Sequence, residues 1–543
     1  MQAPQPPPDG TKTICEDRCR LVQQDEAFDA SGSPKLVPSL LLPAAPPPEL
    51  LPQRPAVYPP DAAGEGAEDG AGRPSLTERL WSQLGALAAP LAPLARPLGA
   101  VWSTFLSGCR PRPAAPPLEW HPRRPWLAAA DGEGRVAVVE VPGAAGPGAG
   151  APGGGRNGSL GPGPAPRPEV LQAGPGAVRA LLAHPTLQPQ ALSLAWCPTS
   201  PGLLAVGVPG GVALWAVAGE GRPPLAAAGR GGGPWLRMLR SRVPGARVVG
   251  LSWSPDGRLL AAASPDQAGL QVHDVASGVS TPVAAGPAAF DLVRWSPCGN
   301  YVFAAGTGAR HFYIFETQRW RWARWETAAG PAGPAGAEIN LGPAGPASSS
   351  AGSTHSSVVA AAWAPAAPGR NPVLLACLGP RGPGGGLVAL HLVEGAPGLG
   401  AQLLPVALPE LGAAVRPAPG AASPPGPPRV VDLAWEAAGE RLAVLLQPQQ
   451  GAPLVALYAT CVDPLVSARL LGFARPGAEL CAGAGAGAAG QAAASAAPAA
   501  LLALPGCLTA ARTAPTGAGA GGPCCVVSAR VGARGVYNLP CYF

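Results

Sequence analysis

The sequence predicts an all-β fold, a seven-bladed β-propeller with a short helical N-terminal extension and long disordered insertions rich in Gly, Pro and Ala. Three observations predict it. A unit marked by tryptophan recurs along the chain, each copy carries the same series of short strands and turns, and low-complexity segments separate the copies. Because one four-stranded sheet buries too little surface alone, such units are expected to stack radially and close into a ring.

The repeated unit is an alternating strand that ends in Trp, followed by a Pro turn, a strand of small residues and another alternating strand. The clearest copy reads Val249 to Gly257, then Leu259 to Ser264, then Leu270 to Val275. In its Ser-Pro-Asp-Gly turn, Pro fixes φ and Gly tolerates a positive φ. The next copy follows from Leu292 to Phe315. Repeats of this kind are typical of WD40-type blades.

Six tryptophans mark the units and are the candidate structural residues of the blades: Trp120, Trp196, Trp253, Trp295, Trp363 and Trp435. One step alone, from Trp253 to Trp295, matches a bare blade of about 40 to 45 residues. The excess in the other steps is assigned to Pro/Gly/Ala-rich loops at about 142–176, 218–234, 327–356 and 395–428, and a further such loop is expected at 476–498. A seventh unit without Trp is expected from residues near 465 to 475 and 499 to 543, so the propeller is predicted to span 118–543.

Two further regions are expected before the propeller. Residues 1–73 are predicted to be mostly disordered, with a possible ring-closing strand at Thr11 to Val22 or Leu36 to Leu42. Residues 74–109 are predicted to form two short helices, because a capping box precedes an apolar stripe that prolines interrupt. The stripe packs on the propeller or docks a partner or a membrane surface, and packing is the favoured reading. Its members are Leu80, Trp81, Leu84, Leu87, Trp102 and Phe105.

Composition narrows the class of protein. The formal net charge is +6, but Lys12 and Lys35 are the only lysines, and the excess of Arg, Ala, Gly and Pro suggests biased base composition in the gene. The charge therefore does not predict direct nucleic-acid binding, which needs basic residues clustered on one face. Twelve cysteines are sparse for a disulfide scaffold, so a reducing compartment is expected. The longest apolar candidate, Leu80 to Ala95, contains two prolines and is too short to span a bilayer.

No catalytic, cofactor or metal site is predicted. Gly485 to Gly490 fits the dinucleotide-binding pattern, yet it lies in an Ala/Gly tract with no strand before it. The six histidines are scattered without a paired spacing, and the Cys15/Cys19 and Cys524/Cys525 pairs lack a second ligand pair at zinc-site spacing. The protein is therefore expected not to be an enzyme.

The segment Arg319 to Trp325 alternates Arg with aromatic residues. Two readings stay open. The segment could stack on nucleic-acid bases with cation–π support. It could instead form the outer strand of the fourth blade, with Trp packed and Arg solvated, and this second reading is favoured.

Parts of the chain resemble the aladin family of WD-repeat nucleoporins. Leu118 to Pro122 resembles that family's opening blade, Leu259 to Val275 its third blade, Gln318 to Trp325 a following strand, and Gly535 to Phe543 the close of its final blade. Arg135 to Val139 and Val212 to Trp215 depart from standard repeats, because they lack the Trp-Asp ending.

The resemblance implies a non-enzymatic scaffold of the nuclear pore complex at the nuclear envelope, which supports nucleocytoplasmic transport of protein and RNA. It implies other nucleoporins as partners, including a membrane-embedded pore anchor, and no transmembrane segment in this chain. The alternative is a generic WD40 adaptor in another assembly, such as a ubiquitin ligase or a vesicle coat. A propeller hydrolase is a third reading, but it needs polar residues at the central channel, where Ala and Ser are expected instead.

Overall fold

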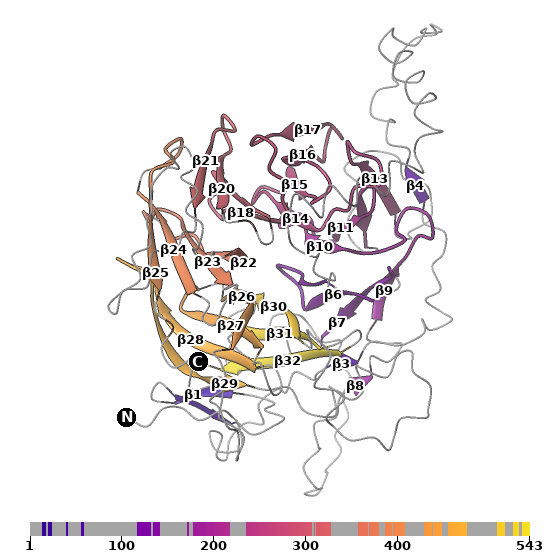
Figure 1. Ribbon diagram of the computed structural model, residues 1–543. Coiled ribbons are helices and arrows are strands. Elements are labelled where there is room, and N and C mark those ends of the chain that lie inside the picture. Colours follow the sequence, from indigo (N-terminus) through magenta and orange to yellow (C-terminus); the bar gives the residue numbers. More distant parts are fainter. Residues whose placement is uncertain are drawn as a thin grey trace, which may run out of the picture.

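The structure is a computed structural model of the 543-residue chain. The described part comprises residues 14–17, 20–23, 40–41, 56–58, 117–131, 134–141, 171–172, 178–217, 235–306, 309, 311–326, 357–367, 369–379, 386–393, 395–406, 408, 428–436, 438–447, 454–474, 508–515, 525–531 and 535–542. Its strands form sheets that radiate around a common centre, so the fold is an all-β propeller (Figure 1).

Six sheets are regular blades, each built on four antiparallel strands in chain order, with one strand of another sheet intervening in blade 1. Blades 1 to 3 consist of β5 (Leu118–Trp120), β6 (Trp126–Ala130), β7 (Val136–Glu140) and β9 (Val178–Leu182); β10 (Ser193–Trp196), β11 (Leu203–Val208), β12 (Gly211–Ala216) and β13 (Trp235–Arg240); and β14 (Gly250–Trp253), β15 (Leu259–Ala263), β16 (Leu270–Asp274) and β17 (Ser280–Val283). Blades 4 to 6 consist of β18 (Leu292–Trp295), β19 (Tyr301–Ala305), β20 (His311–Glu316) and β21 (Trp322–Glu326); β22 (Ser357–Trp363), β23 (Val373–Gly379), β24 (Gly386–Leu392) and β25 (Ala401–Val406); and β26 (Arg429–Trp435), β27 (Arg441–Gln447), β28 (Leu454–Cys461) and β29 (Ser467–Ala474).

The remaining sheet, here called the closing sheet, has a different plan. Its consecutive antiparallel strands are β30 (Leu508–Pro515), β31 (Cys525–Val531) and β32 (Gly535–Tyr542). The other edge of β32 pairs with two strands from the N-terminal region, β1 (Ile14–Asp17) in parallel and β3 (Leu40–Leu41) in antiparallel. β2 (Arg20–Gln23) and β8 (Leu171–Gln172) extend the sheet further. The closing sheet therefore joins segments from both halves of the chain.

The first strand of each blade lies innermost, and these strands contact one another in sequence around the centre. β30 lies between β26 of blade 6 and β5 of blade 1. The closing sheet thus completes the ring, and no blade is left with an open face toward a missing neighbour.

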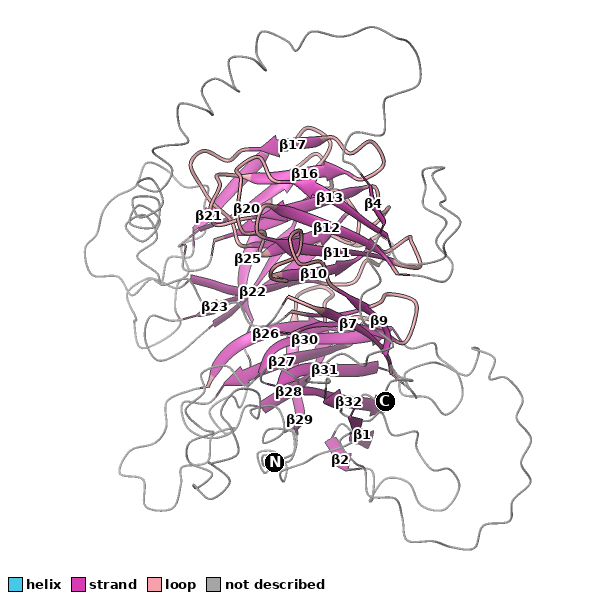
Figure 2. Cartoon of the chain, turned by 90° about the vertical axis from the view of Figure 1, so that its right-hand side faces the viewer, coloured by secondary structure: helices cyan, strands magenta, loops and turns pink. Residues whose placement is uncertain are grey.

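The prediction of seven regular blades with a helical extension is wrong in its number of blades. Six blades follow the repeated plan, and closure uses a sheet whose strands come from distant parts of the chain and carry no local repeat. Residues near 465 to 475, which were expected in a seventh unit, form β29 of blade 6. The described residues contain strands and loops but no helix (Figure 2), and the predicted helical segment 74–109 lies outside them.

Several predicted loops fall partly or wholly outside the described residues. The regions 218–234, 327–356 and 476–498 lie outside them. The region 142–176 contains β8, and the region 395–428 contains β25, the outer strand of blade 5. The Leu-Leu-Pro-Val pattern inside β25 is apolar enough to pack on the blade, so the insertion in this region is shorter than the composition suggested.

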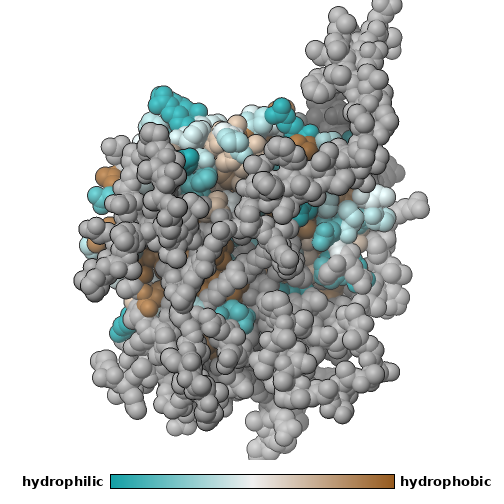
Figure 3. All heavy atoms as spheres, in the orientation of Figure 1, coloured by the Kyte–Doolittle hydropathy of each residue, from teal (hydrophilic) through white to brown (hydrophobic). Residues whose placement is uncertain are grey.

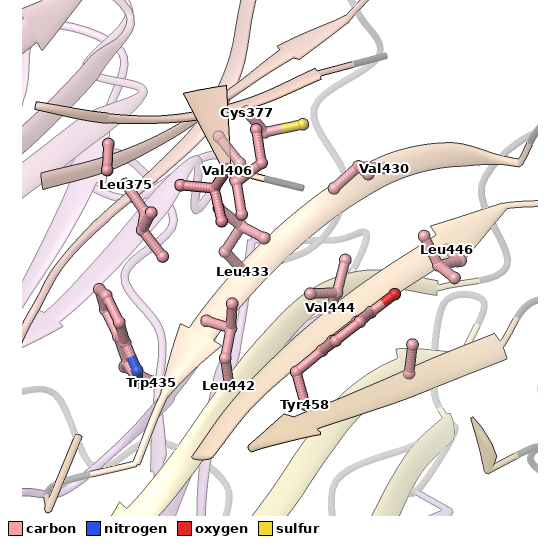
Figure 4. Packing of buried hydrophobic residues seen from close by; sticks show 14 of the residues in the cluster. Leu375, Cys377, Val406, Val430, Leu433, Trp435, Leu442, Val444, Leu446 and Tyr458 are labelled. Carbon is pink, nitrogen blue, oxygen red and sulfur yellow. The ribbon is translucent and has the colours of Figure 1, made fainter. Parts of the chain in front are cut away.

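The hydrophobic core is divided into clusters that lie between neighbouring sheets. The largest one packs blade 5 against blade 6, with Leu375 and Val406 from one side meeting Leu433, Leu442 and Val444 from the other (Figure 4). Second strands such as β6 and β15 are rich in Ala, and those alanines are almost fully buried. Small side chains are needed there because both faces of each sheet are covered by the adjacent sheets.

The outer edge of blade 2 carries an added strand. β4 (Ala56–Tyr58) pairs in parallel with β13, placing Ala56 beside Trp235 and Tyr58 beside Arg237. In the described part, β21 of blade 4 has a partner on its inner side alone, β20. Hydrophilic side chains reach the upper rim of the ring, and hydrophobic ones reach its left side (Figure 3). Among the described strands, the outer edges of blades 2 and 4 thus differ in whether a further strand pairs with them.

Candidate functional site

The six marker tryptophans each occupy the last position of an innermost strand, one in each regular blade. Their side chains are between 4% and 8% exposed. The turn that follows each of them joins the first strand of a blade to the second. We call this side of the ring, which also carries the turns between third and fourth strands, the tryptophan face.

Three of the indoles hydrogen-bond to the preceding blade at one equivalent position. The Nε1–H groups of Trp196, Trp253 and Trp363 donate to the backbone oxygens of Glu119, Ala195 and Arg294, at 3.3, 3.0 and 3.0 Å. Each acceptor residue directly precedes the tryptophan of its own blade. Buried indole N–H groups need an acceptor, and here the acceptor lies across the seam between two sheets.

Two of the indoles bond within their own blade. Trp295 donates through Nε1 to the backbone oxygen of Gly299 at 2.9 Å, while its backbone N–H bonds across the seam to Ser252 Oγ at 2.8 Å. Trp435 donates to Thr460 Oγ1 at 3.0 Å. The seam between blades 5 and 6 is filled by the largest apolar cluster, to which Trp435 belongs.

The seam that closes the ring is more polar. Trp120 Nε1 donates to Ser528 Oγ at 2.9 Å, and Ser528 Oγ donates to Asn538 Oδ1 at 2.6 Å. The fully buried guanidinium of Arg530 donates to the backbone oxygen of Ala130 at 2.7 Å. Burial lowers the pKa of Arg530 to about 10, and the charge of nearby Asp131 acts in the opposite direction. Blade 1 and the closing sheet are thus joined by directional bonds.

A buried amide joins blades 1 and 2. Gln188 accepts a hydrogen bond from Trp215 Nε1 at 2.6 Å through its Oε1 atom. Its Nε2 atom donates to the backbone oxygens of Gly134 and Leu182, at 2.7 and 3.1 Å. The side chain is 3% exposed, so its polar atoms are satisfied by protein groups from three segments.

Turns on the tryptophan face are held rigidly. Ser254 donates to the Asp256 carboxylate, and this bond is the largest influence that lowers the pKa of Asp256. Gly257 has φ of +70°, and a Cβ atom there would lie 2.1 Å from Thr199 Oγ1 of blade 2. The Ser-Pro-Asp-Gly turn thus needs Gly for its backbone angle and for its close approach to the neighbouring blade.

An aromatic cluster lies on the tryptophan face of blade 1. The ring of His121 makes edge contacts with Trp126 and Trp196 at centroid separations of 5.6 and 4.9 Å. Arg124 places its guanidinium carbon 4.6 Å from the centroid of Trp126. Burial is the largest cause that lowers the pKa of His121 to about 4, so this histidine is a neutral packing residue at neutral pH.

A second neutral histidine lies between blades 2 and 3. His273 is fully buried, and its Nδ1 atom is 2.5 Å from Ser280 Oγ. Its Nε2 atom has no hydrogen-bond partner among the described residues. Burial lowers its pKa from 6.5 to about 4.

We expect the protein to lose stability as the pH falls below 6.5. In that range the unfolded chain protonates His273, whereas the folded chain resists protonation until about pH 4. Each pH unit in this interval should remove up to about 1.4 kcal/mol from the free energy of unfolding through this residue alone. Stability above pH 6.5 should not depend on it. Urea denaturation at a series of pH values measures the slope.

The matched variant is His273→Gln, which cannot be protonated in this range. It should show a shallower slope than the parent protein. His121 contributes in the same direction, because its pKa is also lowered, so part of the slope should remain. Equal slopes in the two proteins would contradict this account of His273.

The Arg/Trp segment forms a turn and the outer strand of blade 4. The fully buried Glu316 accepts hydrogen bonds from the backbone N–H groups of Gln318 and Arg319, at 2.6 and 3.0 Å. Trp320 has φ of +53°, in the left-handed region, and its ring packs edge-on against Trp295. The strand β21 follows, as the favoured interpretation of this segment predicted, but of its two tryptophans Trp325 is buried and Trp322 is exposed.

Other candidate residues fall elsewhere. The stripe of Leu80, Trp81, Leu84, Leu87, Trp102 and Phe105 lies outside the described residues, and so does the Gly485 to Gly490 tract. Within the described ranges, no three His, Cys, Asp or Glu side chains are grouped so that they could hold a metal ion. No helix in that same part of the chain is long and apolar enough to cross a membrane.

Sequence reasoning missed the polar seam residues. Ser528 and Arg530 alternate with apolar residues in β31, and this spacing was a usable signal of a polar face. Gln188 stands in an ordinary polar loop sequence, and nothing local distinguishes it from the exposed Gln190.

The chain is 32% identical to aladin from Arabidopsis thaliana over 299 residues, which are 52% of this chain and 57% of the relative. It thus spans little more than half the length of that curated relative. No protein-family model matches the chain.

Two solved structures also align with it. The alignment with the β-propeller domain of Cps50 (Swd1) from Myceliophteria thermophila covers 79% of this chain and 96% of that domain. The sequence identity is 12% and the TM-score is 0.43. The alignment with hydrazine synthase from Kuenenia stuttgartiensis covers 64% of this chain and 78% of the synthase chain. The sequence identity is 12% and the TM-score is 0.37. The sequence similarity, and not these structures, supports an aladin-like protein.

Proposed function

We propose that the protein is a non-enzymatic scaffold of the nuclear pore complex, located at the nuclear envelope, which supports nucleocytoplasmic transport of protein and RNA. The observation that carries the proposal is the 32% identity to aladin over 299 residues. The family resemblance described above supplies the pore role. Other nucleoporins, including a membrane-embedded pore anchor, are the proposed partners.

The architecture supports a scaffolding role. Marker indoles bond across seams, and the closing seam is fastened by Trp120, Ser528 and Arg530. Such a ring presents its turns in fixed positions, which suits binding to several neighbours at once. The polar side chains at the seams bond to one another or to backbone groups, so they serve packing in this arrangement.

Localisation of the tagged full chain in cells tests the proposal. We expect a continuous rim of signal at the nuclear envelope and recovery of nucleoporins when the protein is affinity-purified. The variant Val279→Ala changes an exposed side chain in the turn between β16 and β17 and serves as a folded control for the tagged protein. A diffuse cytosolic signal, or recovery of ligase or coat subunits without nucleoporins, would overturn the proposal and favour a general adaptor.

A further inference from the structure

The outer edge of blade 4 matches the edge of blade 2 that already carries an added strand. β13 begins with Trp235, Leu236 and Arg237, and these three residues pair with β4. β21 begins with Trp322, Ala323 and Arg324, at the same place in its blade. Among the described residues, β21 has β20 as its sole partner. Its outward N–H and C=O groups form a template for another extended segment.

The surface beside this edge is aromatic and basic. The Trp322 side chain is 44% exposed, and its ring makes an edge contact with Tyr313 at a centroid separation of 5.5 Å. Arg319 and Arg321 are exposed in the preceding turn. The buried Glu316 of the same turn bonds to backbone N–H groups and not to either guanidinium among the described contacts. This turn therefore carries positive charge that a ligand can neutralise.

The turn is held in place before any ligand binds. Thr317 donates through its backbone N–H to the oxygen of Asn300 at 3.0 Å, and through Oγ1 to the oxygen of Gly299 at 2.9 Å. Trp320 packs against Trp295. Because these contacts tie the turn to the rest of blade 4, binding there costs little loss of conformational entropy.

We propose that the β21 edge binds an extended peptide that runs parallel to β21, with acidic residues immediately before its paired segment. The direction follows from β4, which runs parallel to β13. A parallel strand enters beside the start of β21, next to Arg319 and Arg321, so the acidic residues belong on its N-terminal side. An apolar segment then lies along Trp322 to Arg324. The precedent of strand addition favours a peptide over single-stranded nucleic acid, which cannot form the backbone ladder.

Binding of labelled synthetic peptides to the purified full chain tests this proposal. The main probe has three acidic residues followed by Ala-Val-Tyr, the sequence of β4. The matched probe carries the same residues in the reverse order, and a third probe has Pro in place of the central Val. We expect the first probe to bind about tenfold more tightly than either of the others. Fluorescence anisotropy measures the affinities.

Variants of the protein locate the site. Trp322→Ala should weaken binding of the first probe about tenfold. The double variant Arg319→Ala/Arg321→Ala should weaken binding by a similar factor at low salt and by a smaller factor at high salt. Arg258→Ala removes another exposed arginine on the tryptophan face and should leave binding unchanged. Thermal unfolding of each variant checks that the ring is intact.

The outcomes separate the possibilities. Equal binding of the ordered, reversed and Pro-containing probes would overturn the proposal, and so would affinity that does not respond to Trp322→Ala. Binding of a single-stranded oligouridine in place of the acidic probe, with loss in the same variants, would replace it with a nucleic-acid site. The experiment uses purified protein, so its result does not depend on whether the chain localises to the nuclear pore.

Discussion

Replacing Trp120 with Ala is expected to lower the free energy of unfolding by about 3 to 5 kcal/mol. The side chain is 4% exposed and packs in the cluster between blade 1 and the closing sheet. The substitution leaves a cavity there and removes the indole N–H that bonds to Ser528. Chemical denaturation followed by tryptophan fluorescence or circular dichroism measures the change.

Trp322→Ala is the matched control, because it removes the same side chain from an exposed site on an outer strand. Its effect should stay within about 1 kcal/mol. Equal losses of stability in the two variants would contradict the stabilising role of Trp120 at the closing seam.

Replacing Gln188 with Leu should destabilise the protein by about 3 kcal/mol or more. The leucine fills a similar space but leaves three buried groups without their partner, namely the indole N–H of Trp215 and the carbonyls of Gly134 and Leu182. Each buried group that loses its hydrogen bond costs about 1 to 3 kcal/mol. Equilibrium denaturation in urea provides the measurement.

The neighbouring Gln190→Leu is the control for this variant. Gln190 is exposed, so the same chemical change there should leave stability nearly unaltered. A small loss of stability in Gln188→Leu would mean that water or rearranged side chains satisfy the three groups. The Gln188 amide would then not be needed to hold blades 1 and 2 together.

The sequence predicted the regular blades well because each one is a local unit. Trp253, the Ser-Pro-Asp-Gly turn and the alanine strand that follows lie within a few residues of each other, and local physics is enough to order them. For the closing sheet, the β-pattern offered Thr11 to Val22 and Leu36 to Leu42 as alternative ring-closing strands but did not give their pairing. Its β32 pairs with β1 and β3, which lie hundreds of residues away and have no repeat to mark them.

The same distinction holds for the candidate site. The marker tryptophans are visible in the sequence, but their acceptors are not, because a backbone oxygen such as that of Ala195 has no sequence signature. That β21 has no outer partner among the described strands is likewise visible only once the blade order is known. The Arg/Trp alternation showed an outer strand, and the structure added which neighbouring turn supports it.

The cross-seam bonds are alike at several joints, so they do not by themselves set the number of sheets in the ring. Trp196, Trp253 and Trp363 all reach back to the residue before the previous blade's tryptophan, so every such joint is interchangeable with the others. A joint of that kind can be repeated any number of times without specifying a total. The number of sheets is instead set at the closing seam. There Ser528 and Arg530 of the closing sheet form hydrogen bonds to blade 1 that do not occur at the other seams described above.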